Sequence, residues 1–363
     1  MNNSLKVPMK FLLGSFGVIA AAAIAMAGYL IYPGTPSSAS SLIFKGYVRL
    51  PSDGVLSVLD YLTVSDHMLF VTGESSGDVN KVRIDDADSL PTAADVTKWP
   101  GEGPAAHGVV IDPSTRLAFV TRSETNTVDV FDPAKMDVIK RIPVADDPDA
   151  IFYDEFDKLV YVASGDSHLA TLIDPSTQTT IATIALNGAP EYAAFDASTR
   201  LLYQNLHDTS TVVAVDIAKR AVVQGWPLQG CEAPTGMAID EVHRRLFIGC
   251  NANAVLAIFD LIEHRVVATV PIGKAPDSVA FDPELQRIYT TGKSGVLVVI
   301  QQDEPNRYKV LDTVHLHYGA HTLTVDLATH VLYVAYAGLF VDPRVAVFIS
   351  RPEPVTHSLT GLM

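Results

Sequence analysis

A unit of 42 to 47 residues recurs seven times along the chain, and this repeat restricts the possible folds more than any other feature. In a clear copy, one apolar segment ends at Asp (residues 107–112, HGVVID), a second follows (117–120, LAFV) and a third ends again at Asp (128–132, VDVFD). The residues that head the seven copies are Asp60, His107, Asp149, Glu191, Thr235, Asp277 and His321.

The apolar segments of each copy are predicted to be β-strands. They are short and rich in β-branched residues, and no apolar stripe with a period of 3.6 residues is present. A fourth apolar segment lies between copies, for example at 138–143 and 266–271. Seven repeats of four strands are typical of a propeller. We therefore predict an all-β fold, a seven-bladed β-propeller with four-stranded blades, over residues 42–350.

The two ends of the repeat region are predicted to meet in one blade. The segment Phe44–Leu50 has the character of a fourth strand but precedes the first copy, whereas the seventh copy has no fourth strand after it. The simplest arrangement makes Phe44–Leu50 the outer strand of the last blade, so that no blade is left with an open edge. Residues 351–363 show no strand pattern and are predicted to form a C-terminal tail.

The N-terminus has the pattern of an export segment. Lys6 and Lys10 precede an apolar run from Phe11 to Tyr32. Two interpretations stay open for residues 1–32: a signal peptide cleaved after the A-x-A run that ends at Ala27, or an uncleaved membrane anchor of about 20 apolar residues. Residues 33–41 are predicted to be a linker that would suit an inner-membrane tether. Both interpretations predict a periplasmic or otherwise extracytoplasmic domain.

The net charge restricts the class of partner. The chain carries 26 Lys and Arg against 41 Asp and Glu, a formal net charge of −15. A surface this acidic repels phosphate backbones, so no nucleic acid is expected to bind. A small molecule or a protein ligand at the channel face is the expected partner.

One copy carries a family resemblance. Residues 119–132 (FVTRSETNTVDVFD) closely resemble the YVTN repeat of bacterial surface and periplasmic β-propellers, and residues 70–77 and 161–168 resemble it more loosely. The resemblance covers roughly Leu42 to Ser350. It implies a seven-bladed propeller in a group that includes lactonase-like enzymes, cofactor-bearing oxidoreductase subunits and proteins without known activity. Residues 203–207 and 248–251 lack the Val-Thr-Asn core, so the resemblance transfers no binding residue.

The residues that head the seven copies are predicted to form a ring at one mouth of the channel. The innermost strands of a propeller line its axis, and their equivalent ends meet. Six ring residues can be charged or can ligate a metal: Asp60, His107, Asp149, Glu191, Asp277 and His321. Crowded carboxylates repel one another, so water, raised pKa values or a bound cation must relieve the repulsion.

A divalent metal is one possible cofactor of this ring, and no other cofactor is indicated. Asp60, His107 and His321 fall on neighbouring blades and are the candidate metal ligands, because imidazole with carboxylate suits Zn²⁺, Mn²⁺ or Fe. The competing interpretation is a solvated mouth that binds no ion.

Further polar residues are candidates of lower rank. Loops after the second strand of each copy are expected to reach the same face, with Glu124, Asp166, His168, His207 and Asn251 as candidates or as ordinary loop residues. His315 and His317 are expected on the surface of an outer strand. Cys231 and Cys250 are either a disulfide or two small buried side chains.

Two functions are compatible with these observations. The first is an exported ligand- or protein-binding propeller without established catalysis. The alternative is a metal-dependent, lactonase-like hydrolase that uses the ring. A haem-bearing redox subunit is disfavoured because no C-x-x-C-H motif occurs. We identify no Ser-His-Asp triad from the sequence.

Overall fold

The computed structural model describes residues 36, 39–51, 56–85, 89–99, 101, 105–135, 137–336, 338–339 and 342–351. The predicted signal peptide or anchor at 1–32 lies outside the described residues, as do most of the predicted linker and tail. Among the helices that the described residues form, none is long and apolar enough to cross a membrane.

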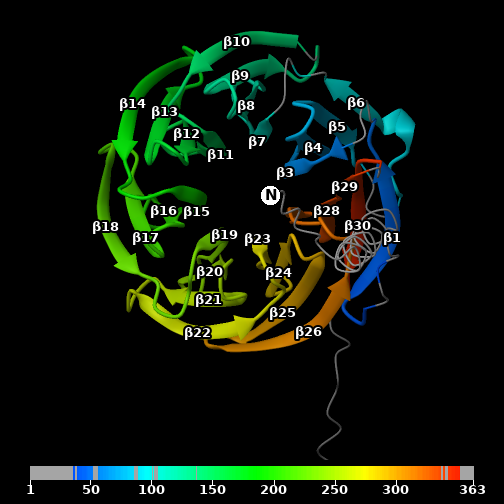
Figure 1. The fold of residues 1–363 in the computed structure, drawn as a ribbon, viewed down its shortest axis with the longest axis vertical. Helices are drawn as coiled ribbons and strands as arrows, with labels where there is room; N and C mark the ends of the chain where they lie inside the picture. Colours follow the sequence, from blue (N-terminus) through cyan, green and yellow to red (C-terminus); the bar gives the residue numbers. More distant parts are fainter. Residues whose placement is uncertain are drawn as a thin grey trace, which may run out of the picture.

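Seven four-stranded antiparallel sheets are arranged as blades around an axis in the described part of the chain (Figure 1). Blade 1 is β3-β4-β5-β6, blades 2 to 6 follow in chain order up to β26, and blade 7 is β27-β28-β30-β1. The predicted all-β, seven-bladed fold is confirmed.

The strands of each blade run in chain order from the axis outward in blades 1 to 6. The inner strands are β3 (Leu59–Ser65), β7 (Ala106–Ile111), β11 (Pro148–Asp154), β15 (Pro190–Asp196), β19 (Pro234–Asp240), β23 (Pro276–Asp282) and β27 (Leu323–Asp326). The second strands are β4 (Met68–Gly73), β8 (Ala118–Arg122), β12 (Leu159–Ser164), β16 (Leu201–Leu206), β20 (Arg245–Cys250), β24 (Arg287–Gly292) and β28 (Val331–Tyr336). The third strands are β5 (Val79–Arg83), β9 (Thr127–Asp132), β13 (Leu169–Asp174), β17 (Thr211–Asp216), β21 (Val255–Asp260), β25 (Val296–Glu304) and β30 (Arg344–Ser350). The outer strands are β6 (Val96–Trp99), β10 (Asp137–Pro143), β14 (Thr179–Ala185), β18 (Ala221–Pro227), β22 (Arg265–Pro271), β26 (Arg307–His315) and β1 (Leu42–Arg49). A short 3₁₀ helix, η1 (Ala93–Asp95), precedes β6.

Both ends of the propeller region contribute to blade 7. Strand β1 pairs antiparallel with β30, from Leu42 opposite Ser350 to Arg49 opposite Arg344. A two-stranded sheet that the sequence does not predict, β2 (Leu56–Ser57) with β29 (Gly338–Leu339), joins the chain between β1 and β3 to the connection before β30. The ring is therefore closed by hydrogen bonds between segments about 300 residues apart in sequence.

The hydrophobic core lies between neighbouring blades. One cluster joins Phe119, Val128 and Val130 of blade 2 to Val160 and Val162 of blade 3, all fully buried. Both faces of the middle strands are covered by a neighbouring blade, so these strands are almost continuously apolar rather than alternating. This double burial explains why the second strands are so recognisable in the sequence.

The Asp residues at or directly after the ends of the inner strands of blades 2 to 7 shape the following turns. In each, one carboxylate oxygen accepts the backbone N–H two residues on, at 2.9 to 3.1 Å. These residues are Asp112, Asp154, Asp196, Asp240, Asp282 and Asp326. This is the Asx-turn geometry, and it gives the repeated Asp a structural role.

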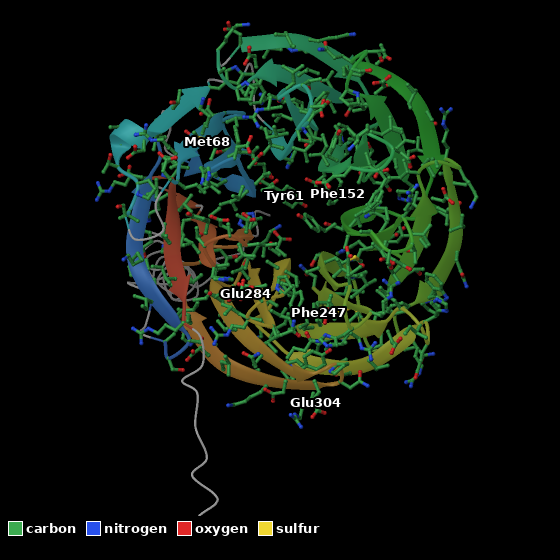
Figure 2. The ribbon with its side chains drawn as sticks, turned by 180° about the vertical axis from the view of Figure 1, so that it is seen from behind. Tyr61, Met68, Phe152, Phe247, Glu284 and Glu304 are labelled. Carbon is green, nitrogen blue, oxygen red and sulfur yellow. A yellow bond between two sulfur atoms is a disulfide. The ribbon has the colours of Figure 1, made fainter. Side chains whose placement is uncertain are left out.

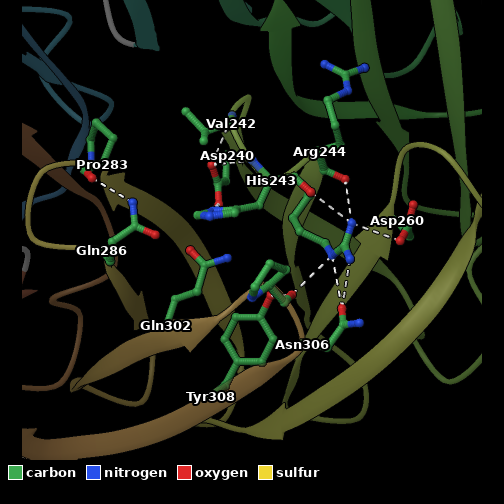
Figure 3. Close-up of polar contacts among 12 residues, drawn as sticks. Asp240, Val242, His243, Arg244, Asp260, Pro283, Gln286, Gln302, Asn306 and Tyr308 are labelled. Carbon is green, nitrogen blue, oxygen red and sulfur yellow. Dashed lines mark hydrogen bonds and ion pairs between the residues drawn. The ribbon is translucent and has the colours of Figure 1, made fainter.

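A buried arginine links blades 5 and 6. Arg245 Nη1 lies 2.8 Å from Asp260 Oδ2, and the same guanidinium donates to Asn306 Oδ1 and to the carbonyl of Pro305. Figure 3 shows the dashed lines that join this guanidinium to Asp260 and to Asn306. The guanidinium of blade 5 thus donates hydrogen bonds to two acceptors in the turn between β25 and β26 of blade 6.

A disulfide ties the approach to β19 to the end of β20. Cys231 and Cys250 are bonded, with their Cα atoms 5.2 Å apart, which lies within the usual range for disulfides. Of the two interpretations of these cysteines, the structure contains the bonded pair. Asn251, the residue directly after Cys250, lines the cavity at the channel mouth, so the bond lies close to that cavity.

A truncation that removes residues 1–50 is expected to lower the free energy of unfolding by at least about 4 kcal/mol. It removes the buried side chains of Leu42, Val48 and Leu50 and exposes the edge of β30. Fully burying such a side chain contributes about 1.5–3 kcal/mol. Chemical denaturation measures the loss. A matched truncation of residues 1–35 keeps β1, and equal stability of the two truncated proteins would contradict the closure by β1.

Candidate functional site

The ring residues of blades 1 to 6 lie at bulges in the innermost strands. In blade 2, Ala106 pairs with Arg122 and Val109 with Val120, so β7 has one residue more than β8 around His107. The equivalent register shift surrounds Asp60, Asp149, Glu191, Thr235 and Asp277 in their own blades. A bulge bends a strand and re-aims a side chain. A bulge at this point of the repeat can therefore direct one side chain of each of these six blades toward the channel mouth.

Neighbouring blades fix the backbone of the ring. The side chain before the last residue of a second strand donates a hydrogen bond to the carbonyl of the next ring residue. Thr121 Oγ1 donates to Asp149 O and Asn205 Nδ2 to Thr235 O, each at 2.7 Å. Thr72 and Thr291 donate in the same way to His107 O and His321 O. These contacts hold four of the ring residues against the blade before them.

All seven ring residues line one cavity of about 300 Å³ at the mouth of the channel. The other lining residues are Tyr61, Glu74, Asp147, His207, Asn251 and Lys293. Figure 2 shows Tyr61 close to the centre of the ring. Side chains spread from residue 60 to residue 321 thus converge on one small space.

A second set of lining residues comes from the position directly after each second strand. Glu74, His207, Asn251 and Lys293 occupy it in blades 1, 4, 5 and 6. Sequence reasoning named His207 and Asn251 but missed Glu74 and Lys293, although the position recurs at a fixed point of the repeat. Glu124, Asp166 and His168 lie further along the same turns, are exposed and do not line this cavity.

The two histidines near β26 differ in environment. His315 ends β26 and is exposed, as predicted. His317 is only 2% exposed, and its Nδ1 lies 2.6 Å from the carbonyl of Tyr318, so the expected surface position is wrong. The reason is that β26 ends at His315, and the chain then turns inward, where strand alternation no longer applies.

Three ring residues of blades 1, 2 and 3 form a compact cluster. His107 Nδ1 lies 2.6 Å from Asp60 Oδ2 and 3.5 Å from Asp149 Oδ1. One ligand atom from each of the three residues lies within 4.8 Å of the others, a spacing that could hold a metal ion. The structure thus brings Asp149, rather than the predicted His321, to Asp60 and His107.

His321 contacts Asp277 of blade 6 instead, with 3.8 Å between Nε2 and Oδ2. Its Nδ1 lies 2.9 Å from Gly319 O. Strand β27 begins only at Leu323, so His321 precedes the strand and is not held in a bulge like the other ring residues. The shorter inner strand of blade 7 is the physical reason for its different contact.

The other nitrogen of His107 contacts a serine. His107 Nε2 lies 2.8 Å from Ser123 Oγ, and Ser123 occupies the position directly after β8. Asp60, His107 and Ser123 therefore form one hydrogen-bonded line of acid, imidazole and hydroxyl. Sequence reasoning did not find it, because the three residues belong to different blades or strands.

The only G-x-S-x-G run of the chain, residues 73–77, is unrelated to this line of residues. It follows β4 in a turn between two strands, and Ser75 Oγ accepts the backbone N–H of Val58. The nucleophile elbow that this pattern marks elsewhere joins a strand to a helix.

Excess negative charge determines the electrostatics of the cavity. Burial, together with the charge of Asp60, raises the pKa of Asp149 to about 7. Burial and the charge of Asp149 raise the pKa of Glu191 to about 8. The charge of Asp277, assisted by Asp60 and Glu74, raises the pKa of Lys293 despite partial burial. The cavity therefore favours bound protons and positive charge.

The pKa of His107 shows the same effect. Burial by itself would lower it, but the hydrogen bond to Asp60 and the charges of Asp149, Asp60 and Glu74 outweigh burial. The result is a pKa raised from the ordinary 6.5 to about 9. At neutral pH the imidazole therefore carries a positive charge that partly neutralises the ring.

Comparison with solved structures places the chain among propellers. A structure of Kuenenia stuttgartiensis hydrazine synthase superimposes with a TM-score of 0.70 and 16% sequence identity, covering 84% of this chain and 98% of the other. A structure of RRP9 WD40 repeats gives a TM-score of 0.69 and 12% identity, covering 88% and 100%. Identities this low show the fold alone. No family model matches the chain, and no curated protein matches it in sequence.

Stability is expected to fall as pH rises from about 6.5 to about 9. His107 has a higher pKa in the folded chain than its ordinary value, so its contribution is fully present below the ordinary pKa and lost as pH rises through the folded pKa. Urea denaturation at several pH values measures the slope. Asp149 and Glu191, with raised pKa values of about 7 and 8, contribute to the same slope. His107→Gln should therefore make the slope shallower without abolishing it, whereas exposed His168→Gln should leave it unchanged. Equal slopes in both variants would contradict the assigned environment of His107.

Proposed function

We propose that this chain is an exported binding propeller of the YVTN-repeat type whose channel mouth takes a small, positively charged ligand. The main support for this proposal is the excess of acidic over basic side chains that line one cavity of about 300 Å³. Six carboxyl groups line it: Asp60, Glu74, Asp147, Asp149, Glu191 and Asp277. Lys293 and three histidines are the basic side chains in the same lining.

A cationic ligand would relieve the repulsion among these carboxylates. The pKa values of Asp149 and Glu191, about 7 and 8, mean that without a cation these groups hold protons near neutral pH. A bound cation would displace the protons and pair with the carboxylates, so binding and proton release are coupled. The net charge of −15 would also attract cations to the protein surface.

Export is supported by two features of the chain. Lys6 and Lys10 precede the apolar run from Phe11 to Tyr32, which suits a signal peptide or an anchor. The bond between Cys231 and Cys250 suits an oxidising compartment. We therefore assign the propeller to the periplasm or another extracytoplasmic space.

A second candidate function is metal-dependent, lactonase-like hydrolysis. The observation in its favour is the spacing of Asp60, His107 and Asp149, whose ligand atoms lie within 4.8 Å of one another. One imidazole and two carboxylates would suit Zn²⁺, Mn²⁺ or Fe. An ion held there could polarise a carbonyl or activate water.

Calorimetric titration with putrescine, choline, Ca²⁺, Mn²⁺ and Zn²⁺ separates these proposals. We expect an organic cation to bind with proton release, and Asp149→Asn or Glu191→Gln to weaken binding at least about tenfold, since a hydrogen bond to a charged group contributes about 1.5–3 kcal/mol. Glu124→Gln removes an exposed mouth-loop acid outside the cavity and should leave affinity unchanged. Binding of Mn²⁺ or Zn²⁺ alone, lost in Asp149→Asn, would favour the metal site. No heat with any cation would overturn the binding proposal.

Intact mass tests export. Expressed from the full gene, the protein is expected in the periplasm with a mass starting at Gly28, or in the membrane at full mass if residues 1–32 anchor it. Its two cysteines should resist a thiol-reactive maleimide without reductant. A full-mass protein that stays in the cytoplasm with reactive thiols would contradict export.

A further inference from the structure

We propose that Ser123, His107 and Asp60 form a nucleophilic triad that hydrolyses small neutral or positively charged esters. The inference goes beyond ligand binding, because it assigns covalent chemistry to one side of the channel mouth. It rests on the contacts of His107.

The contacts of His107 match the division of roles in such a triad. Asp60 Oδ2 lies 2.6 Å from Nδ1, and Ser123 Oγ lies 2.8 Å from Nε2. A carboxylate at Nδ1 keeps a proton on that nitrogen. The imidazole is positively charged at neutral pH, so Nε2 accepts the serine proton only at the alkaline pH where the ring is neutral. Nucleophile and base within hydrogen-bond reach, with the base oriented by a third group, is the arrangement that activates a hydroxyl.

The exposed fractions of the three side chains also fit a triad, because the acid and the base are shielded from water and the serine is accessible. The side chains of His107 and Asp60 are 14% and 12% exposed, so the ion pair is shielded from water. Ser123 begins the turn after β8 and is partly exposed, so a substrate can reach it. Its backbone N–H donates to Ala105 O at 3.2 Å, which anchors the residue while the hydroxyl points to His107.

Ser123 stands out from its equivalents in the repeat. The position directly after the second strand holds Glu74, Gly165, His207, Asn251 and Lys293 in the other described blades. None of these five residues is a serine, so none of them repeats the contact of Ser123 with a ring histidine. The line of acid, imidazole and hydroxyl is thus a feature of blades 1 and 2 and not a by-product of the repeat.

The reaction balances with water as the only co-reactant. Ser123 Oγ attacks the ester carbonyl carbon while His107 Nε2 takes the hydroxyl proton. The bond from that carbon to the alcohol oxygen then breaks, and His107 returns the proton to the departing alcohol. Water then gives a proton to His107 and attacks the acyl carbon. The bond from that carbon to Ser123 Oγ breaks, the acid leaves, and His107 returns the proton to Oγ. The products are one carboxylic acid and one alcohol.

The cavity selects the class of substrate. Asp60 and His107 line the cavity, and Ser123 adjoins it through its contact with His107 Nε2. A volume of about 300 Å³ admits only a small ester, and the acidic lining repels an anionic one. Lys293 lines the same cavity and interacts electrostatically with Asp60 and Glu74. Its largest electrostatic partner is Asp277 of blade 6, and its positive charge offsets part of the negative charge of the lining.

The triad and the metal site use His107 in mutually exclusive ways. In the triad, Nδ1 carries a proton shared with Asp60, whereas a metal ion would take the place of that proton. Cation binding elsewhere in the cavity does not involve Ser123. Substitution of Ser123 therefore separates the triad from both proposed functions.

The test uses a fluorophosphonate probe, which forms a covalent bond with an activated serine, on the purified propeller between pH 7 and 10. We expect labelling at Ser123, located by peptide mass, and none in Ser123→Ala. Asp60→Asn should slow labelling by about 10⁴, the loss typical of removing a triad carboxylate. Ser167→Ala removes a serine from the equivalent turn of blade 3 and is the matched control, expected to label normally.

Ester hydrolysis gives the second readout. Neutral 4-nitrophenyl acetate and cationic acetylcholine should be cleaved faster than anionic 4-nitrophenyl succinate, and EDTA should have no effect. Absence of labelling in the folded protein, or labelling that persists in Ser123→Ala, would overturn the triad. Turnover that requires added Mn²⁺ or Zn²⁺ and survives Ser123→Ala would overturn it in favour of the metal site. Cation binding measured in Ser123→Ala shows separately whether the binding proposal stands.

Discussion

The pairing of β1 with β30 is the contact on which the rest of the structure depends. A ring of seven wedge-shaped blades holds its channel mouth at a fixed width only if the last blade is complete. Leu42–Arg49 completes it by hydrogen bonding to Arg344–Ser350, so the two ends of the propeller region share one sheet. Because each blade packs its apolar faces on its two neighbours, closure at blade 7 stabilises every blade indirectly.

The mouth concentrates charge because the blades are equivalent. A bulge at the same point of blades 1 to 6 places a side chain at the same height, and the carbonyl of several ring residues is held by the preceding blade. Equivalent positions filled with acids then bring carboxylates together, at an electrostatic cost. Burial, together with these charges, raises the pKa values of Asp149 and Glu191, whereas Asp60 and the neighbouring charges raise that of His107 against its burial. A cation, a proton or an imidazolium is therefore favoured there.

Within this symmetrical framework, function depends on the departures from symmetry. Blade 2 has His107 in the ring and Ser123 after its second strand, whereas blade 6 has Asp277 and Lys293 at the same two positions. The side of the mouth formed by blades 1 to 3 contains the shortest acid–imidazole contact of the described ring residues. The proposed metal binding and the proposed ester hydrolysis would compete there for the same imidazole.

The sequence by itself determined the number of blades, the four strands in each, the outer strand supplied by Phe44–Leu50 and the ring of residues from Asp60 to His321. All of these follow from periodicity, since apolar segments and their head residues recur at a constant spacing. Contacts between blades could not be predicted in this way. That His107 meets Asp149 and Ser123, that His321 turns to Asp277, and that Lys293 joins the cavity depend on bulges, strand lengths and turn geometry of individual blades. Periodicity fixes which residues are equivalent, but distances of a few ångströms between side chains are decided only when the blades pack together around the axis.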